Sequence, residues 1–260
     1  MAVHRNSSQR IELMPVEGKM MVNALVPQLD RQVFGLGVPE TIGCQEQMWL
    51  VNHADVEIDW QLEKRDGSVS ARWAQDGLLH YDLRLVPGHD YVDIELVVYN
   101  QSDAAWSDVF AFNCVSPAKA PDFRDPDLRR TYLSVAGEPV AVAQMPRVQG
   151  PRPSIGVYAH RDYSQCLPPF AQVFEATSPV PSDGTWMAIV AASGDAYMAT
   201  AAPASSFMFN NTDFGCIHAA LLLGAIAPQT QVGGHGRVYF AGGGLDDFLG
   251  RHAAGTAAEA

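Results

Sequence analysis

The chain has 260 residues, of which 47% are hydrophobic and 18% charged, and it carries a formal net charge of −12 at pH 7. This hydrophobic content supports a large core and argues against an intrinsically disordered chain. The negative charge argues against nucleic acid or an anionic membrane as a partner, because both bind basic surfaces. We therefore expect a small-molecule or oligosaccharide ligand.

The N-terminal residues lack the apolar segment of a secretory signal, and no window approaches the roughly 20 apolar residues of a membrane-spanning helix. These features predict a cytoplasmic protein. The four cysteines, Cys44, Cys114, Cys166 and Cys216, are far apart in the sequence and form no CxxC pair. We expect reduced and mostly buried thiols, because free cysteine behaves as a small hydrophobic residue.

Alternation of apolar and polar residues dominates the first half of the chain and predicts antiparallel strands. Residues 56–62 and 69–73 flank the turn sequence RDGS and predict a β-hairpin. Two further strands, at residues 79–85 and 92–98, extend this hairpin into a meander. Another strand is expected at residues 108–115.

The polar face of this meander carries charges of both signs, from His80, Asp82, Arg84, Asp93 and Glu95. Such a mixture is typical of cross-strand pairing on a solvated sheet face. We therefore expect this face to be exposed, and a ligand to lie over the other sheet beneath the proline-rich loops.

Two proline-rich segments, residues 116–130 and 144–169, are expected to be loops, because proline lacks the N–H that a strand needs. Long connections inside a compact domain are often binding loops. In the first segment, Arg124, Asp125 and Arg130 are predicted to bind substrate, because guanidinium groups suit uronate carboxylates and vicinal hydroxyls. The alternative is a solvated loop closed by its own salt bridges.

The second half of the chain returns to apolar strand patterns and ends in a helix. Strands are expected at residues 171–177, 185–193, 196–203, 205–211, 215–223 and 236–242. Residues 245–254 predict one short C-terminal helix, followed by a flexible tail at residues 255–260. These elements predict an all-β protein, an antiparallel two-layer sandwich or a barrel, that forms a single domain over residues 1–254.

The segment GLLHYDLRLVPGHDYVDIELVVYNQSDAAWSDVFAFNC, at residues 77–114, resembles the central strands of the galactose-mutarotase-like β-supersandwich proteins. The resemblance implies a large antiparallel supersandwich and a bias toward sugars, because many members of that superfamily bind, epimerise or cleave carbohydrate. Aldose epimerases of the superfamily carry a histidine in the strand that corresponds to DVFAFNC. This chain has Asn113 and Cys114 there, so the family's histidine is not reproduced and Asn113 becomes a candidate substrate-binding residue.

No GxSxG, Walker, GxGxxG or HExxH motif is present, so the catalytic candidates are individual side chains. His160, beside Arg161 and Asp162, and His218, in the apolar sequence CIHAA, could transfer protons near neutral pH. Glu46 lies among apolar residues, which would raise the pKa of its carboxyl group. The alternatives are hydrogen-bonded core histidines and a solvated carboxylate.

Three functions fit these observations. The first is a carbohydrate-active enzyme that uses acid/base proton transfer in epimerisation or β-elimination, with His160 or His218 as acid or base and Arg130 orienting the substrate. The second is a non-catalytic carbohydrate-binding module in which the Trp106 indole stacks on a sugar ring. The third is a metal-dependent enzyme in which His53, His160 and His218 converge on a divalent metal; no other cofactor is expected.

Overall fold

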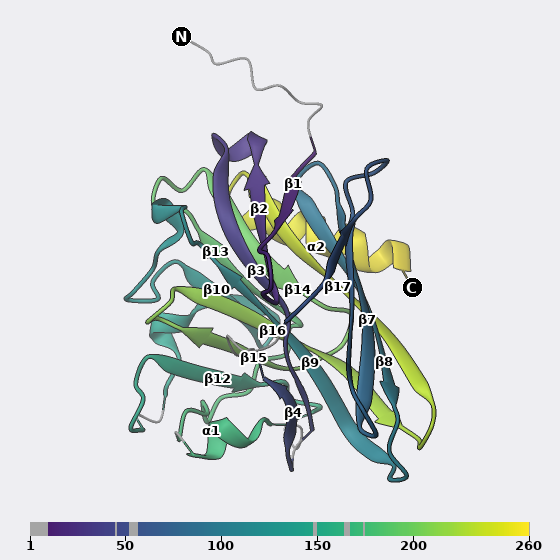
Figure 1. Ribbon diagram of the computed structural model, residues 1–260. Helices are drawn as coiled ribbons and strands as arrows, with labels where there is room; N and C mark the ends of the chain where they lie inside the picture. The colour runs from purple at the N-terminus through teal and green to yellow at the C-terminus, as the bar shows by residue number, and fades with distance from the viewer. Residues whose placement is uncertain are drawn as a thin grey trace.

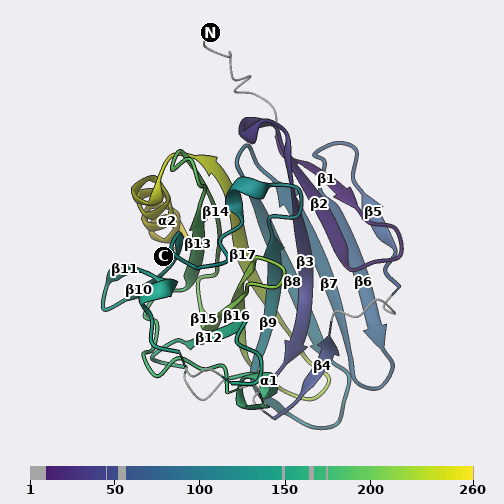
Figure 2. The same ribbon diagram turned by 90° about the vertical axis from the view of Figure 1, so that its left-hand side faces the viewer.

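The structure is a computed structural model that describes residues 10–44, 46–51, 57–147, 150–163, 167–173 and 175–259. Two antiparallel β-sheets are stacked as layers, and a helix packs against the outer face of each (Figures 1 and 2). This arrangement confirms the predicted all-β sandwich. None of the described helices is long and apolar enough to cross a membrane.

Sheet A has the strand order β1, β2, β3, β9, β16, β15, β12, and β4 also pairs with β3. Its strands are β1 (Glu12–Pro15), β2 (Met21–Val26), β3 (Gln32–Gly43), β4 (Met48–Val51), β9 (Trp106–Ser116), β12 (Ile155–Ala159), β15 (Ser205–Asn211) and β16 (Cys216–Ile226). The N-terminal strands of this sheet were not among the predicted elements.

Sheet B has the strand order β11, β10, β13, β14, β17, β8, β7, β6, β5. Its strands are β5 (Trp60–Leu62), β6 (Val69–Gln75), β7 (Leu79–Pro87), β8 (Tyr91–Asn100), β10 (Thr131–Val135), β11 (Glu138–Ala141), β13 (Trp186–Val190), β14 (Ala196–Ala201) and β17 (Gln231–Gly242). The helices are α1 (Pro169–Val173) and α2 (Leu245–Glu259), with short 3-10 turns η1 (Pro27–Leu29), η2 (Pro121–Phe123) and η3 (Val142–Gln144).

The meander of β6, β7 and β8 follows the predicted alternation. Along β7, buried and partly exposed side chains alternate at every position. Gly67, in the turn before β6, has φ of +75°, a left-handed conformation that glycine adopts without steric cost. The first strand of the hairpin is shorter than predicted, because only Trp60–Leu62 pair with β6.

Around β9 and β16 both faces of sheet A are buried, but in different apolar clusters. Val115 and Ala219, at odd-numbered positions of β9 and β16, point into the core between the sheets. Phe112 and Ala220, at even-numbered positions, point outward into an aromatic cluster beneath α1. This alternation fixes the side of the sheet on which each functional side chain of β9 and β16 lies.

Helix α2 covers the part of the outer face of sheet B that β13, β14 and β17 form. The buried ring of Phe248 packs against the rings of Trp186, Tyr197 and Tyr239. The helix continues to Glu259, so residues 255–259 are helical where a tail was expected. Alanine is the strongest helix former, and the alanines around Gly255 outweigh the cost of that glycine.

One strand prediction and one loop prediction are wrong near α1. Residues 171–177 are not a strand, because α1 occupies Pro169–Val173 and Thr177 makes only an isolated bridge to Val157. Ala171 and Ala176 of that segment instead pack into the apolar cluster on the outer face of sheet A. The predicted loop at residues 144–169 contains the strand β12, which is buried on both faces and therefore shows no alternation.

Candidate functional site

A bulge in β3 directs Glu40 toward the outer face of sheet A. In the pairing of β3 with β9, Gly37 lies opposite Cys114 and Thr41 lies opposite Phe112. A step of four residues on β3 therefore matches a step of two on β9, and the extra residues include Glu40. Bulges bend a strand and re-aim its side chains, and they are common next to active sites.

The pairing of β9 with β16 brings Cys114, Cys216 and His218 together. Ile217 lies opposite Val115 and Ala220 opposite Phe112, so His218 faces Cys114 directly across the ladder. Cys216 is two residues from His218 and lies on the same face. One ligand atom from each of these three side chains lies within 4.8 Å of the others. We call Glu40, Cys114, Cys216 and His218 the outer-face cluster.

His218 is held between a backbone carbonyl and a carboxylate. Its Nδ1 lies 3.1 Å from the Phe209 carbonyl oxygen, so Nδ1 carries a hydrogen and donates it. Its Nε2 lies 2.8 Å from Glu40 Oε2. These two atoms are not aligned for a hydrogen bond, so the contact is an ion pair. The His218 side chain is 1% exposed and that of Glu40 27%, so Glu40 is the partly exposed member of the pair, although the Oε2 atom that meets His218 is buried.

The charges of the cluster depend on one another. Burial by itself lowers the pKa of His218, but the negative charges of Cys216 and Glu40 outweigh it and raise that pKa to about 10. A hydrogen bond from Cys114 lowers the pKa of Cys216 to about 6, helped by the imidazolium and opposed by burial. The same hydrogen bond, together with burial, raises the pKa of Cys114. These opposite shifts favour a thiolate at Cys216 and a thiol at Cys114.

Aromatic rings enclose the histidine on the outer face of the sheet. The Phe209 ring centroid lies 4.1 Å from that of His218, and the Phe112 centroid lies 5.6 Å from it. A carboxylate beside a shielded imidazole can take part in proton transfer. Thiolate sulfur and imidazole nitrogen are also the donors that zinc prefers, so the same cluster could hold a metal.

Of the predicted catalytic residues, only His218 lies in the outer-face cluster. His160 is buried at the end of β12, where its Nδ1 accepts a hydrogen bond of 3.3 Å from the Asp162 N–H and its ring lies against Tyr163. Glu46 is exposed, and its Oε2 accepts a hydrogen bond of 3.2 Å from Cys44 Sγ. The apolar surroundings predicted for Glu46 are therefore wrong.

The predicted binding loop is closed by its own polar contacts. Asp125 is buried and accepts hydrogen bonds of 2.8 Å from the Arg130 N–H and from Thr131 Oγ1. The Arg130 guanidinium donates to the carbonyl oxygens of Asp122, Arg124 and Val190. Its donors are thus engaged within the protein, and the alternative of an internally paired loop is the correct one.

Trp106 and Asn113 are interior residues. Trp106 is 7% exposed and stacks on Trp49 with ring centroids 4.2 Å apart, so the predicted sugar platform is wrong. Asn113 points between the sheets, where its Nδ2 donates to Thr200 Oγ1 at 2.9 Å. Its Oδ1 accepts a hydrogen bond from the Ala219 N–H. Asn113 therefore lies on the opposite side of sheet A from Cys114.

The mixed-sign face of the meander is solvated, as predicted. Arg72 pairs with Asp82 at 2.5 Å, and Arg84 bridges Asp66 at 2.9 Å and Glu95 at 3.3 Å. These are cross-strand ion pairs between largely exposed side chains, the arrangement that holds a solvated sheet face together.

The residues that could bind a metal differ from the three histidines predicted from the sequence. Within the described ranges, the group that could surround a metal ion consists of Cys114, Cys216 and His218 and does not include His160. His53 lies outside the described residues. Cys44, Cys114 and Cys216 are free thiols, as predicted, and Cys166 also lies outside the described residues.

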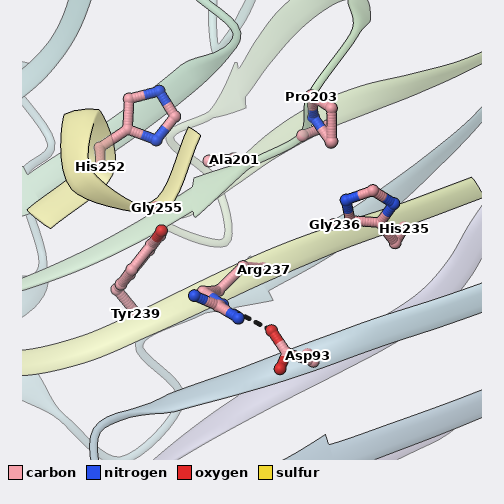
Figure 3. A pocket seen from close by; sticks show the side chains of 10 residues that line it. Asp93, Ala201, Pro203, His235, Gly236, Arg237, Tyr239, His252 and Gly255 are labelled. Atoms are coloured by element: carbon pink, nitrogen blue, oxygen red, sulfur yellow. Dashed lines mark hydrogen bonds and ion pairs between the residues drawn. The ribbon is translucent and has the colours of Figure 1, made fainter. Parts of the chain in front are cut away.

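A recess of about 360 Å³ lies on the outer face of sheet B between β17, β14 and α2 (Figure 3). Arg237 crosses it and pairs with Asp93 at 2.5 Å, as the dashed line in Figure 3 marks. The same guanidinium lies 4.3 Å from the centre of the Tyr91 ring. Because this charge is already neutralised, we take the outer-face cluster of sheet A as the candidate functional site.

No family model and no curated protein matches the chain. Solved structures do match it. A galactose mutarotase-like protein from Lactobacillus casei ATCC 334 aligns with a TM-score of 0.50 and 8% identity, over 89% of this chain and 100% of that one. A galactose mutarotase related enzyme from Lactobacillus acidophilus aligns with a TM-score of 0.48 and 6% identity, over 90% and 98% of the two chains. A putative aldose 1-epimerase from Escherichia coli K12 aligns with a TM-score of 0.43 and 11% identity, over 89% of this chain and 99% of that one.

The chain therefore has a galactose-mutarotase-like fold, as its resemblance at residues 77–114 implied. Sequence reasoning missed Glu40, Cys114 and Cys216 as site residues. The spacing of Cys216 and His218, which puts both side chains on one face of a strand, could have indicated Cys216. No local signal indicated Glu40, because its direction depends on the bulge opposite β9.

Proposed function

We propose that the chain is a carbohydrate-active enzyme that transfers a proton to or from a sugar or uronate, in an epimerase-type or lyase-type reaction, at the outer-face cluster. The observation that carries the proposal is the contact of 2.8 Å between Glu40 Oε2 and His218 Nε2, in which the His218 side chain is buried and that of Glu40 is 27% exposed. The mutarotase-like fold supports a sugar as the substrate, since the similar structures include a galactose mutarotase related enzyme and a putative aldose 1-epimerase.

Glu40 is the catalytic residue in this scheme. Epimerisation and β-elimination both begin when a base removes a proton from the substrate. Glu40 is the partly exposed member of the pair and therefore the one that a substrate can approach. His218 is too deeply buried to touch a substrate and acts as a positioning residue that fixes the carboxylate. This assignment replaces the direct acid or base role expected for His218 from the sequence.

The test compares Glu40→Gln with a matched variant, Glu95→Gln, on the solvated outer face of sheet B. The purified proteins are incubated with a panel of aldoses and uronates. Anomer interconversion and solvent deuterium incorporation are followed by NMR, and unsaturated products by ultraviolet absorbance. We expect Glu40→Gln to lower kcat by roughly 100-fold or more, the usual contribution of a general base, and Glu95→Gln to match the wild type.

His218→Gln separates positioning from direct catalysis. We expect it to lower kcat less than Glu40→Gln does, because the carboxylate remains but is no longer fixed in place. Sugar binding without turnover in the wild-type protein would contradict the proposal and favour the carbohydrate-binding module. Equal activity of Glu40→Gln and the wild type would remove Glu40 from the mechanism.

A further inference from the structure

We propose that Cys114, Cys216 and His218 form a binding site for a thiophilic divalent cation of the zinc class, with the fourth coordination position open beside Glu40. The proposal rests on the positions of these side chains and is independent of the proposed sugar chemistry. Its connection with Glu40 as a base is the one part that rests on the proposed function.

The donor set and its spacing fit such a cation. Two sulfur atoms and one imidazole nitrogen lie within 4.8 Å of one another. Zinc binds cysteine sulfur at about 2.3 Å and histidine nitrogen at about 2.0–2.1 Å, so tetrahedral ligands lie roughly 3.5–3.8 Å apart. Side-chain movements of about 1 Å would therefore complete the site, with no change in the backbone.

The orientation of the imidazole is that of a metal ligand. Metal-binding histidines almost always donate their second ring N–H to a carbonyl or carboxylate, which fixes the ring and the tautomer. His218 Nδ1 makes such a bond to the Phe209 carbonyl oxygen at 3.1 Å. Nε2, the atom that would face the cation, is buried and has no partner aligned for a hydrogen bond.

The ligands come from rigid and adjacent elements. Cys114 is on β9, and Cys216 and His218 are on β16, so the ladder between these central strands fixes their spacing. Phe112 and Phe209 form an apolar wall beside the imidazole. Ligands on strands with an apolar surround give a precise site, because both the backbone and the rotamers are constrained.

Three protein ligands and one open position are the arrangement of a catalytic metal centre. Glu40 Oε2 lies 2.8 Å from His218 Nε2, and it would therefore border the open position. If the proposed function holds, a sugar oxygen bound to the cation would be polarised while Glu40 accepts the proton from the substrate.

The experiment uses the full chain, purified without a metal-binding tag, and titrates it with Zn²⁺ and with Co²⁺ as a spectroscopic probe. We expect one equivalent of metal to bind, a thiolate-to-cobalt charge-transfer band in the near ultraviolet, and a higher melting temperature with Zn²⁺. Cys114→Ser, Cys216→Ser and His218→Gln should each weaken binding by more than the 10- to 100-fold that a change next to a ligand costs.

Cys44→Ser is the matched control, because Cys44 is also a buried free thiol but lies outside the cluster. It should keep the charge-transfer band and the affinity of the wild type. Circular dichroism and melting without metal show whether each variant folds. A wild-type protein that binds no metal, or cluster variants that fold and bind as tightly as the wild type, would overturn the proposal. A disulfide between Cys114 and Cys216 that persists in reductant would overturn it too.

The two proposals fail in different ways. Glu40→Gln should keep the cobalt band, because its carboxylate is not one of the three ligands. Metal binding without turnover of any sugar would leave the cation site standing and remove the proposed function. Turnover that requires Glu40 but is unaffected by chelators, in a chain that binds no metal, would do the reverse.

Discussion

Replacing Asp125 with alanine should destabilise the protein without selectively weakening sugar binding. The Asp125 side chain is 1% exposed and lies 3.7 Å from the Arg130 guanidinium. It also accepts hydrogen bonds from the Arg130 N–H and from Thr131 Oγ1. Removing one partner of a buried ion pair lowers the free energy of unfolding by about 3–5 kcal/mol. Arg130 keeps its carbonyl partners, so we expect about 3–4 kcal/mol, near the lower end of that range.

The assay is urea unfolding followed by circular dichroism, with the midpoint interpreted at constant m. Asp125→Asn retains an acceptor oxygen and should lose only about 1.5–3 kcal/mol, the value of a hydrogen bond to a charged group. Asp127→Asn is the control in the same loop. Asp127 pairs with Arg129 at 3.1 Å, but both side chains are largely exposed, so the change should be under about 0.5 kcal/mol.

An unchanged urea midpoint in Asp125→Ala would refute the structural role of this carboxylate. Loss of sugar binding at full stability would restore the substrate-binding role that the loop sequence first suggested. Equal destabilisation by Asp125→Ala and Asp127→Asn would show that burial of the charge is not the cause.

Two further predictions concern stability. Trp106→Ala should cost about 3–5 kcal/mol by thermal or urea unfolding, because it empties a buried site against Trp49; weaker sugar binding at unchanged stability would contradict this. Burial raises the pKa of Asp183, but hydrogen bonds from Ser134 and Gly137 and the charge of Arg161 outweigh it, and the net pKa lies below 3.8. The stabilisation by Asp183 is therefore complete above the unfolded pKa and lost as pH falls through the folded pKa. The deficit of Asp183→Asn should accordingly shrink below about pH 4, and a deficit that is the same at about pH 3 and pH 7 would exclude this linkage.

The spacing of the outer-face cluster illustrates the limit of local sequence patterns. Cys114 and Cys216 are distant in the chain and meet only because β9 pairs with β16. The alternation of β16 could place Cys216 and His218 on one face, but it could not say what lay opposite them. Glu40 reaches them because β3 has a bulge. A bulge is defined by the pairing of two strands, so the sequence of one strand alone does not reveal it.

The polar loop residues show the same limit for residues that were predicted to bind a ligand. Arg124, Asp125 and Arg130 carry the groups that bind a uronate, and the sequence cannot tell whether those groups face a ligand or the protein. In the structure the Arg130 donors are used on the nearby carbonyls of Asp122 and Arg124 and on the distant carbonyl of Val190. Trp106 was misassigned for the same reason, since its stacking partner Trp49 lies on another strand.

The sequence by itself determined the strands of the meander, the strand at β9, most strands of the second half, the C-terminal helix and the solvated mixed-sign face, because periodicity and turn residues act over a few neighbours. The two-layer architecture followed from the number of those strands and from the resemblance at residues 77–114. Only the tertiary structure decided which strands pair, where β3 bulges, and which face of sheet A carries Cys114. These depend on contacts between residues far apart in the chain, and hydrogen-bond register between strands leaves no periodic signal in either strand alone.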